Sequence, residues 1–166
     1  MTTLLVTEVF ILFLGGALLS IKALVDITII IILNTLVATL TLFCVSLFFK
    51  KLNAYSIFNS ILGTLVGFLT GTLIEIGQLP VGFQYLVKLF PFSHSASLFR
   101  KILMDEPIKL VFLGANPTTI NEFRQNMGID LLINAKPINN LASILYLLAF
   151  GAICFLISFV RLRRKL

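Results

Sequence analysis

Charged side chains are scarce in this chain of 166 residues, making up only 12% of the total. A water-soluble domain carries about a quarter charged residues and is about half apolar. Here 58% of the residues are hydrophobic, and the mean hydropathy is +1.06. These values exclude a soluble globular domain, because too few polar residues are present to cover its surface. They predict an integral membrane protein in contact with the lipid bilayer.

Side chains with catalytic or ligand chemistry are scarce as well. The two cysteines, Cys44 and Cys154, lie inside apolar runs without metal-like spacing, so we interpret them as packing residues. His94 is the single histidine and has no partner for a metal site. A hydrolase using Ser93 and His94 is excluded, because neighbouring residues at a helix start point about 100° apart. With no phosphate-binding loop either, we expect no enzyme, no cofactor and no metal.

The net charge of +6 does not indicate nucleic-acid binding. Six of the thirteen basic residues form two clusters at the ends of apolar runs. This is the positive-inside pattern of membrane proteins, which places both clusters on the cytoplasmic side. The clusters are Lys50-Lys51 and, near the C-terminus, Arg161, Arg163, Arg164 and Lys165.

Three runs without a charge are each long enough to cross a hydrocarbon core about 30 Å thick, at about 1.5 Å per residue. A fourth apolar run contains only Glu8. We therefore predict a single all-α membrane domain in the cytoplasmic membrane, with both termini cytoplasmic. The expected spans are about 3–21, 27–49, 54–75 and 139–160.

The segment 78–137 is expected to form an external re-entrant helical hairpin and a short external helix. A first hairpin helix covers Val81–Leu89, and Pro91 breaks it. Ser93 and His94 are both expected to cap the second helix and to form hydrogen bonds across the hairpin. That helix is expected to end near Met104, at the sequence Asp105-Glu106-Pro107. The short external helix begins with Asn116 as cap and Pro117 as first residue, and ends before Gly128.

Small residues form a stripe along the third span at helical spacing. Small residues let helices approach closely in lipid. Two alternatives remain open: packing within one subunit, or the seam of a homodimer that lines a pathway. The stripe consists of Ser56, Ser60, Gly63, Gly67 and Gly71.

Polar residues in the second span are expected to bond to carbonyl groups or to neighbouring helices; they are Asn34, Thr35, Thr39, Thr41 and Ser46. Glu8 and Glu75 are the charges closest to membrane depth, where ionisable residues are candidates for function. Glu75 lies near the outer end of its span and is expected to reach water. A structural partner and a place in a transport cavity remain equal alternatives for Glu8.

Several of these residues fall in one region with a recognisable pattern. Gly63-Thr-Leu-Val-Gly-Phe-Leu-Thr-Gly71 is followed by Ile76-Gly-Gln-Leu-Pro80, Leu89-Phe-Pro-Phe-Ser-His94, Leu98-Phe-Arg100 and Met104-Asp-Glu-Pro107. This region resembles the permease subunit of type-2 ATP-binding-cassette exporters, closest to the bacterial drug- and antibiotic-resistance branch. The chain matches only the later part of such permeases, from within the third of six spans. It departs from the pattern at Glu75, where the family has proline.

The resemblance implies a transmembrane subunit that exports hydrophobic or amphipathic compounds. Its partners would be a second permease chain and a separate ATP-binding-cassette subunit. The alternative is a truncated, non-transporting membrane protein that acts as an accessory or immunity subunit. The resemblance further implies an external gate in the hairpin, formed by Gly77, Pro80, Phe90, Pro91, Ser93, His94 and Arg100.

Overall fold

The computed structural model describes residues 2–13, 19–133 and 136–163, and 79% of these residues are helical. Among these residues the only strands are two short ones that form an antiparallel pair. The all-α prediction is therefore confirmed. The elements are α1 Thr2–Phe13, α2 Ile21–Ser46, α3 Leu52–Leu69, η1 Ile76–Gln78, α4 Val81–Leu89, α5 Pro91–Val111, α6 Pro117–Asn126, β1 Leu132–Ile133, β2 Lys136–Pro137 and α7 Asn140–Arg163.

Three of the described helices are long and apolar enough to cross a membrane: α2, α3 and α7, with 26, 18 and 24 residues. They correspond to three of the four expected spans. The fourth, 3–21, contains α1, which is 12 residues long, and residues 14–18 of this span lie outside the described residues. The third span is shorter than expected, because α3 ends at Leu69 and not at residue 75.

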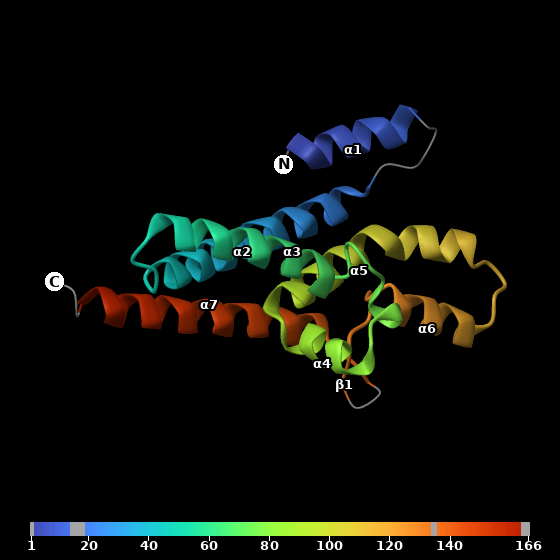
Figure 1. Ribbon diagram of the computed structural model, residues 1–166. Helices are drawn as coiled ribbons and strands as arrows, with labels where there is room; N and C mark the ends of the chain where they lie inside the picture. Colours follow the sequence, from blue (N-terminus) through green and yellow to red (C-terminus); the bar gives the residue numbers. More distant parts are fainter. Residues whose placement is uncertain (1, 14–18, 134–135, 164–166) are drawn as a thin grey trace.

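Helices α2, α3 and α7 lie lengthwise beside one another, with α4, α6 and the short strands gathered toward one end of them (Figure 1). Helices α2, α5 and α7 pack against each other, and their shared core contains Ile30, Val37, Leu98 and Leu147. A second apolar cluster joins the end of α3 to η1, α4 and the segment after α6; it contains Leu69, Ile76, Val87 and Leu131. Helix α5 therefore lies at the centre of the fold.

The other end of α2, α3 and α7 carries four residues of the two basic clusters, namely Lys50, Lys51, Arg161 and Arg163. The Nε atom of Arg161, near the end of α7, donates to the carbonyl of Leu47, 3.1 Å away, and its guanidinium lies 4.0 Å from the ring centre of Phe48. Leu47 and Phe48 belong to the turn between α2 and α3, which continues into Lys50-Lys51. The expected topology requires these residues on the same side of the membrane, and the structure places the turn after α2 and the last turns of α7 at the same end (Figure 1).

Two expectations for α5 are wrong. Its N-cap is Phe90, with Pro91 as the first helical residue. Ser93 and His94 therefore lie inside the helix. The helix also continues through Pro107 to Val111 instead of ending near Met104. Lys109 bridges this turn by pairing with Asp105 at 2.7 Å, which favours a continued helix although proline removes one hydrogen bond of the helix backbone.

The other two short helices agree with the sequence. Helix α4 has the expected bounds of Val81–Leu89. Helix α6 begins as expected, with Asn116 Oδ1 accepting from the backbone N–H of Thr118 at 3.2 Å and with Pro117 as its first residue. It ends before Gly128, whose φ of +67° is a left-handed conformation that favours glycine. These termini are set by local capping chemistry.

Candidate functional site

The backbone between α3 and η1 is not helical, which frees carbonyl groups close to the apolar spans. Gly71 turns the chain with a φ of +71°. The Oγ of Ser93 donates to the carbonyl of Leu69 at 2.8 Å. The Nη2 of Arg100 donates to the carbonyl of Gly71, also at 2.8 Å. Both donors come from α5, so side chains of the hairpin satisfy the broken end of α3.

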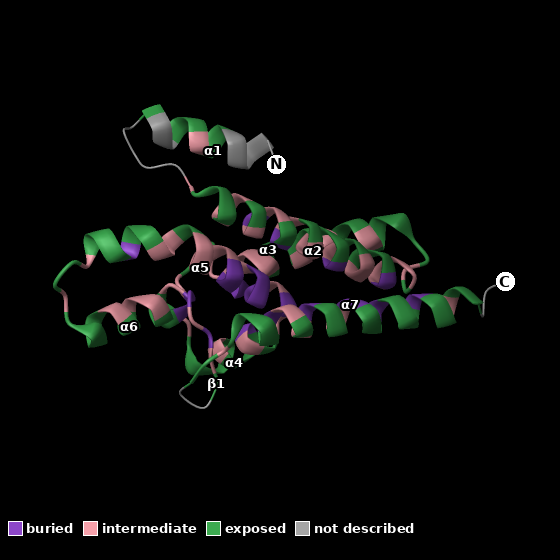
Figure 2. Ribbon diagram, turned by 180° about the vertical axis from the view of Figure 1, so that it is seen from behind, coloured by how far each residue is buried: buried purple, intermediate pink, exposed green. Residues whose placement is uncertain are grey.

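The same face of α5 reaches other irregular segments. Ser97 Oγ donates to the carbonyl of Ile129 at 2.6 Å, and Lys101 Nζ donates to that of Ile138 at 3.1 Å. Lys101 also pairs with Asp130 at 3.6 Å. Figure 2 shows that buried residues gather in the first turns of α5. We call the side chains of Ser93, His94, Ser97, Arg100 and Lys101 the polar face of α5.

His94 connects the hairpin to α7. Its Nε2 lies 2.8 Å from the carbonyl of Lys88 in α4, and its Nδ1 lies 3.4 Å from the Oγ of Ser143 in α7. A carbonyl only accepts, so Nε2 carries the proton and Nδ1 accepts from Ser143. The ring centre lies 4.6 Å from that of Tyr146, whose hydroxyl donates to the carbonyl of Leu89. Burial lowers the pKa of His94, which favours the neutral ring.

Arg100 is a half-buried cation that pairs with none of the described carboxylates. Its Nη1 is buried without a hydrogen-bond partner, and burial lowers the pKa of its guanidinium. Two glycines flank this atom: a Cβ on Gly128 would lie 3.2 Å from Nη1, and one on Gly71 would lie 3.4 Å from it. Glycine at both positions leaves room for the guanidinium.

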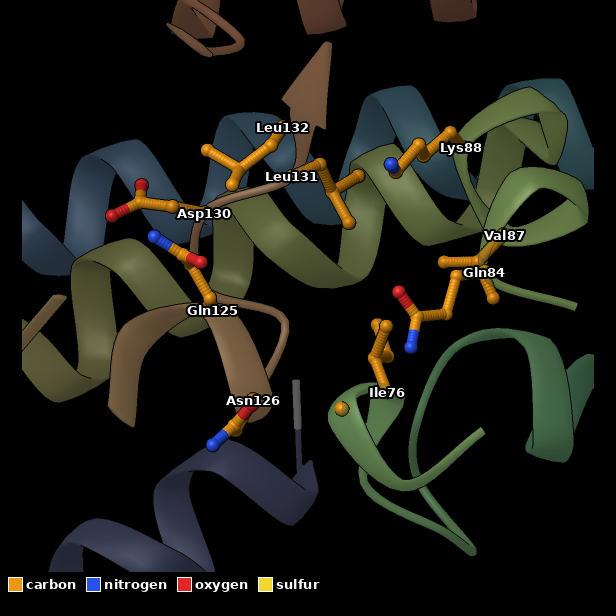
Figure 3. A pocket seen from close by; sticks show the side chains of 10 residues that line it. Ile76, Gln84, Val87, Lys88, Gln125, Asn126, Asp130, Leu131 and Leu132 are labelled. Atoms are coloured by element: carbon orange, nitrogen blue, oxygen red, sulfur yellow. The ribbon is translucent and has the colours of Figure 1, made fainter. Parts of the chain in front are cut away.

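A small polar cavity of about 140 Å³ lies beside the hairpin, between η1, α4 and the end of α6 (Figure 3). Lys88 and Asp130 line it together with Gln84, Gln125 and Asn126. Gly77 lies so close to α6 that a Cβ there would come within 2.9 Å of the Cα of Asn126. The absence of a side chain at Gly77 therefore allows η1 and α6 to pack this closely.

A larger cavity of about 510 Å³ lies between α2 and α3, where Phe92 of α5 also contributes. Its walls are largely apolar, but Asn34 and Asn59 face it from opposite helices. The Oδ1 atom of each is buried and has no hydrogen-bond partner. The expectation that Asn34 bonds to a carbonyl or to a neighbouring helix is therefore wrong for this oxygen. It holds for the other polar residues of α2, because Thr35, Thr39, Thr41 and Ser46 each donate to a carbonyl of their own helix.

The small-residue stripe is not one continuous helical face. Ser56, Ser60 and Gly63 are exposed, and a Cβ on Gly63 would meet no atom within 4 Å. A Cβ on Gly67 would meet the side chain of Leu73 at 2.9 Å. Gly71 lies beyond the helix, in the turn that follows it. Packing within the described chain therefore accounts for the stripe only at Gly67 and Gly71.

The remaining candidates are placed as follows. Glu8 accepts from the backbone N–H of Leu19 at 3.2 Å, and Glu75 accepts from Gln78 Nε2 at 3.1 Å. Each acidic residue thus has a partner within the chain. Pro80 is the N-cap of α4, and the rings of Phe90 and Phe92 meet edge to face at 5.4 Å.

Sequence reasoning missed Ser97, Lys101, Ser143, Tyr146 and Asn59. A signal existed for two of them, because Ser93, Ser97, Arg100 and Lys101 follow the i, i+4, i+7, i+8 spacing of one helical face. Searches for related proteins found that no family model, no curated protein and no solved structure matches the chain. The interpretation of the site therefore depends on its geometry and on the sequence pattern.

Proposed function

We propose that this chain is part of the transmembrane subunit of an exporter powered by a separate ATP-binding-cassette subunit. It would move hydrophobic or amphipathic compounds across the cytoplasmic membrane, together with a second permease chain. The observation that supports the proposal most strongly is the broken end of α3. Its free carbonyl groups accept hydrogen bonds from Ser93 and Arg100 on the polar face of α5. Irregular backbone at membrane depth is tolerated where protein or a water-filled cavity covers it, as at transport pathways.

The contacts of α5 suggest how such a pathway would operate. Ser93 and Arg100 bind the end of α3, while His94 contacts both α4 and α7. A displacement of the hairpin would therefore pull on two spanning helices at once. We propose the hairpin as the outer gate, with the polar face of α5 coupling its position to α3 and α7.

The test is co-expression of the chain with candidate ATP-binding-cassette subunits from the same genome, followed by affinity purification through a tag on the chain. ATP-dependent uptake of daunorubicin, an amphipathic fluorescent compound, is then measured in inverted membrane vesicles. The proposal expects co-purification and uptake. Arg100→Gln should reduce uptake strongly, because it shortens the side chain that reaches Gly71. The matched control is Lys109→Gln on the same helix, where the side chain is exposed.

The outcomes separate the two interpretations of the sequence. Co-purification without uptake would support the non-transporting accessory subunit and contradict transport by this chain. Absence of any association with the ATP-binding subunit would contradict both. Equal loss of uptake in Arg100→Gln and Lys109→Gln would remove the special role of the polar face of α5.

A further inference from the structure

Helix α4 separates the small polar cavity beside the hairpin from an exposed apolar surface. Gln84 and Lys88, which lie one helical turn apart, line the cavity. On the other side of the helix, Tyr85, Leu86 and Leu89 are exposed. Lys88 lies where the two surfaces meet, because its Nζ is 5.1 Å from the ring centre of Tyr85. One short helix therefore places a cation between a polar cavity and an apolar face.

The contacts of α4 place this boundary close to the membrane surface. The hydroxyl of Tyr146 donates to the carbonyl of Leu89, the last residue of α4. Tyr146 lies six residues after Asn140, the first residue of α7, which is about 9 Å along a helix of 24 residues. Leu89 is therefore level with the first quarter of that span, where acyl chains meet headgroups. A lysine stem at this depth brings its ammonium group to the headgroups.

The charge of Lys88 has no counter-ion within the part of the chain that the structure describes. Its Nζ pairs with none of the described carboxylates. Asp130 also lines the cavity, but Arg124 donates to it at 2.7 Å and Lys101 lies 3.6 Å from it. Two cations thus already offset Asp130, and Lys88 leaves the lining with an excess of positive charge. This charge favours an anion as the occupant.

The size of the cavity limits what can enter it. Its volume of about 140 Å³ lies below the range of about 300–1,000 Å³ typical of small-molecule sites, so it accommodates only a small polar group. Gln84 of α4 and Gln125 of α6 line it from two elements, and their amides can both donate and accept (Figure 3). Any apolar part of the ligand must lie outside, where Leu86 and Leu89 offer exposed apolar surface.

We propose that Lys88 and this cavity bind the headgroup of an anionic phospholipid, with the acyl chains lying against Leu86 and Leu89. The lipid phosphate accepts from the Nζ of Lys88, and headgroup hydroxyls bond to the amides of Gln84 and Gln125. Phosphatidylglycerol has both features. Phosphatidylcholine lacks the hydroxyls and would bring a second positive charge next to Lys88, so it is disfavoured. Binding of this lipid is independent of the transport proposed above.

The experiment uses the full chain in phosphatidylcholine nanodiscs that contain a small share of one photo-reactive lipid. The first probe is phosphatidylglycerol with a diazirine in one acyl chain, and the second is phosphatidylcholine with the same acyl chains. After illumination, the labelled peptides are quantified by mass spectrometry. We expect the phosphatidylglycerol probe to label α4 about fivefold more than the phosphatidylcholine probe, which is the factor for about 1 kcal/mol per lysine near anionic lipid.

Variants locate the site. Lys88→Gln should abolish the preference at α4, whereas Lys88→Arg should keep it because the charge remains. Lys109→Gln is the matched control: it removes the same charge from an exposed residue that pairs with Asp105 outside the cavity, and the preference at α4 should persist. Circular dichroism checks that each variant is folded, and the comparison of the two probes on the unmodified chain needs no variant.

Equal labelling of α4 by the two probes would overturn the proposal, and so would a preference that persists in Lys88→Gln. Added glycerol 3-phosphate tests whether a soluble anion is the true ligand, with sodium chloride at equal ionic strength as the control for screening. If glycerol 3-phosphate alone abolishes the preference, the site takes a free phosphate and the lipid is excluded. A preference that withstands it supports the lipid.

Labelling requires no ATP-binding subunit, so the two proposals fail separately. Selective labelling without ATP-dependent uptake would leave the lipid site standing while the exporter function fails. Uptake without selective labelling would show the reverse.

Discussion

Arg100 donates from Nη2 to the carbonyl of Gly71 at 2.8 Å, joining residues 29 positions apart in the sequence. Gly71 provides the left-handed turn that ends α3, and Arg100 satisfies the carbonyl that this turn frees. Ser93 does the same for Leu69, about two turns earlier along α5. The end of α3 is therefore determined by long-range contacts as well as by glycine.

Replacing Gly71 by alanine should destabilise the protein. Its φ of +71° is strained for alanine, and the Cβ would lie 2.7 Å from Cγ1 of Ile76. We expect a loss of at least about 1–2 kcal/mol in the free energy of unfolding. Gly63→Ala is the matched control in the interior of α3; its Cβ meets open space and should add about 0.5–1 kcal/mol of stability. Thermal unfolding of both variants in the same detergent measures the difference. Equal effects would contradict the distinction between the two glycines.

Ser93→Ala should lower the stability of the protein by removing the long-range contact between α5 and α3. The substitution removes the donor to the buried carbonyl of Leu69 and should cost about 1–3 kcal/mol of stability. Ser56→Ala provides the control, because Ser56 is exposed on α3. Denaturant titration monitored by circular dichroism gives both values. If Ser56→Ala lost as much stability as Ser93→Ala, the proposed stabilising role of the bond between Ser93 and Leu69 would be contradicted.

His94 should make stability depend on pH. Burial and the nearby charge of Lys101 lower its pKa in the folded protein below the ordinary value of 6.5, although the bond to the Lys88 carbonyl opposes this. The unfolded chain then binds more protons as the pH falls below about 6.5. The stabilising effect of the neutral ring is therefore present above pH 6.5 and is lost at lower pH. Melting temperatures measured from pH 8 to pH 5.5 should decrease once the pH drops below about 6.5.

His94→Gln supplies the control for this pH dependence. His94 is the only histidine of the chain, so no other imidazole titrates in this range. The variant should show a flat stability profile between about pH 7 and pH 5.5, with lower stability at neutral pH because the contacts to Lys88 and Ser143 are weakened. An unchanged slope in the variant would assign the effect to other groups.

Pro107→Ala should stabilise α5. Pro107 is exposed inside a continuous helix, where proline is less favourable than alanine by up to about 3 kcal/mol. Pro117→Ala is the matched control, since Pro117 occupies the first position of α6, where proline is tolerated. Hydrogen exchange of the amides in α5 measures the local effect. A stabilisation of the same size at Pro117 would contradict the positional argument.

The sequence predicted those helices whose ends are determined by residues next to them in the chain. Helix α6 has its capping asparagine and its first-position proline, and α4 is bounded by Pro80 and Phe90. It failed at the end of α3, because residues 70–74 remain uncharged and the termination depends on donors from α5.

The same reason explains the other misses. Asp105-Glu106-Pro107 is a local breaker, yet pairing of Asp105 with Lys109 and with Arg124 of α6 bridges it. The larger cavity is lined by Asn34 of α2 and Asn59 of α3, and hydropathy along each helix contains no information on the relative rotation that brings them to one cavity. Local chemistry could be predicted from the sequence, whereas helix orientation and long-range hydrogen bonds could not.

The contact of Arg161 with the turn at Leu47 and Phe48 has an electrical consequence. It gathers the charges of Lys50, Lys51, Arg161 and Arg163 at one end of the long helices. Moving one positive charge across a membrane against its potential costs about 2.3 kcal/mol per 100 mV. Turning the inserted bundle over would move all of these charges across the membrane together. A membrane potential would therefore favour one orientation of the inserted bundle.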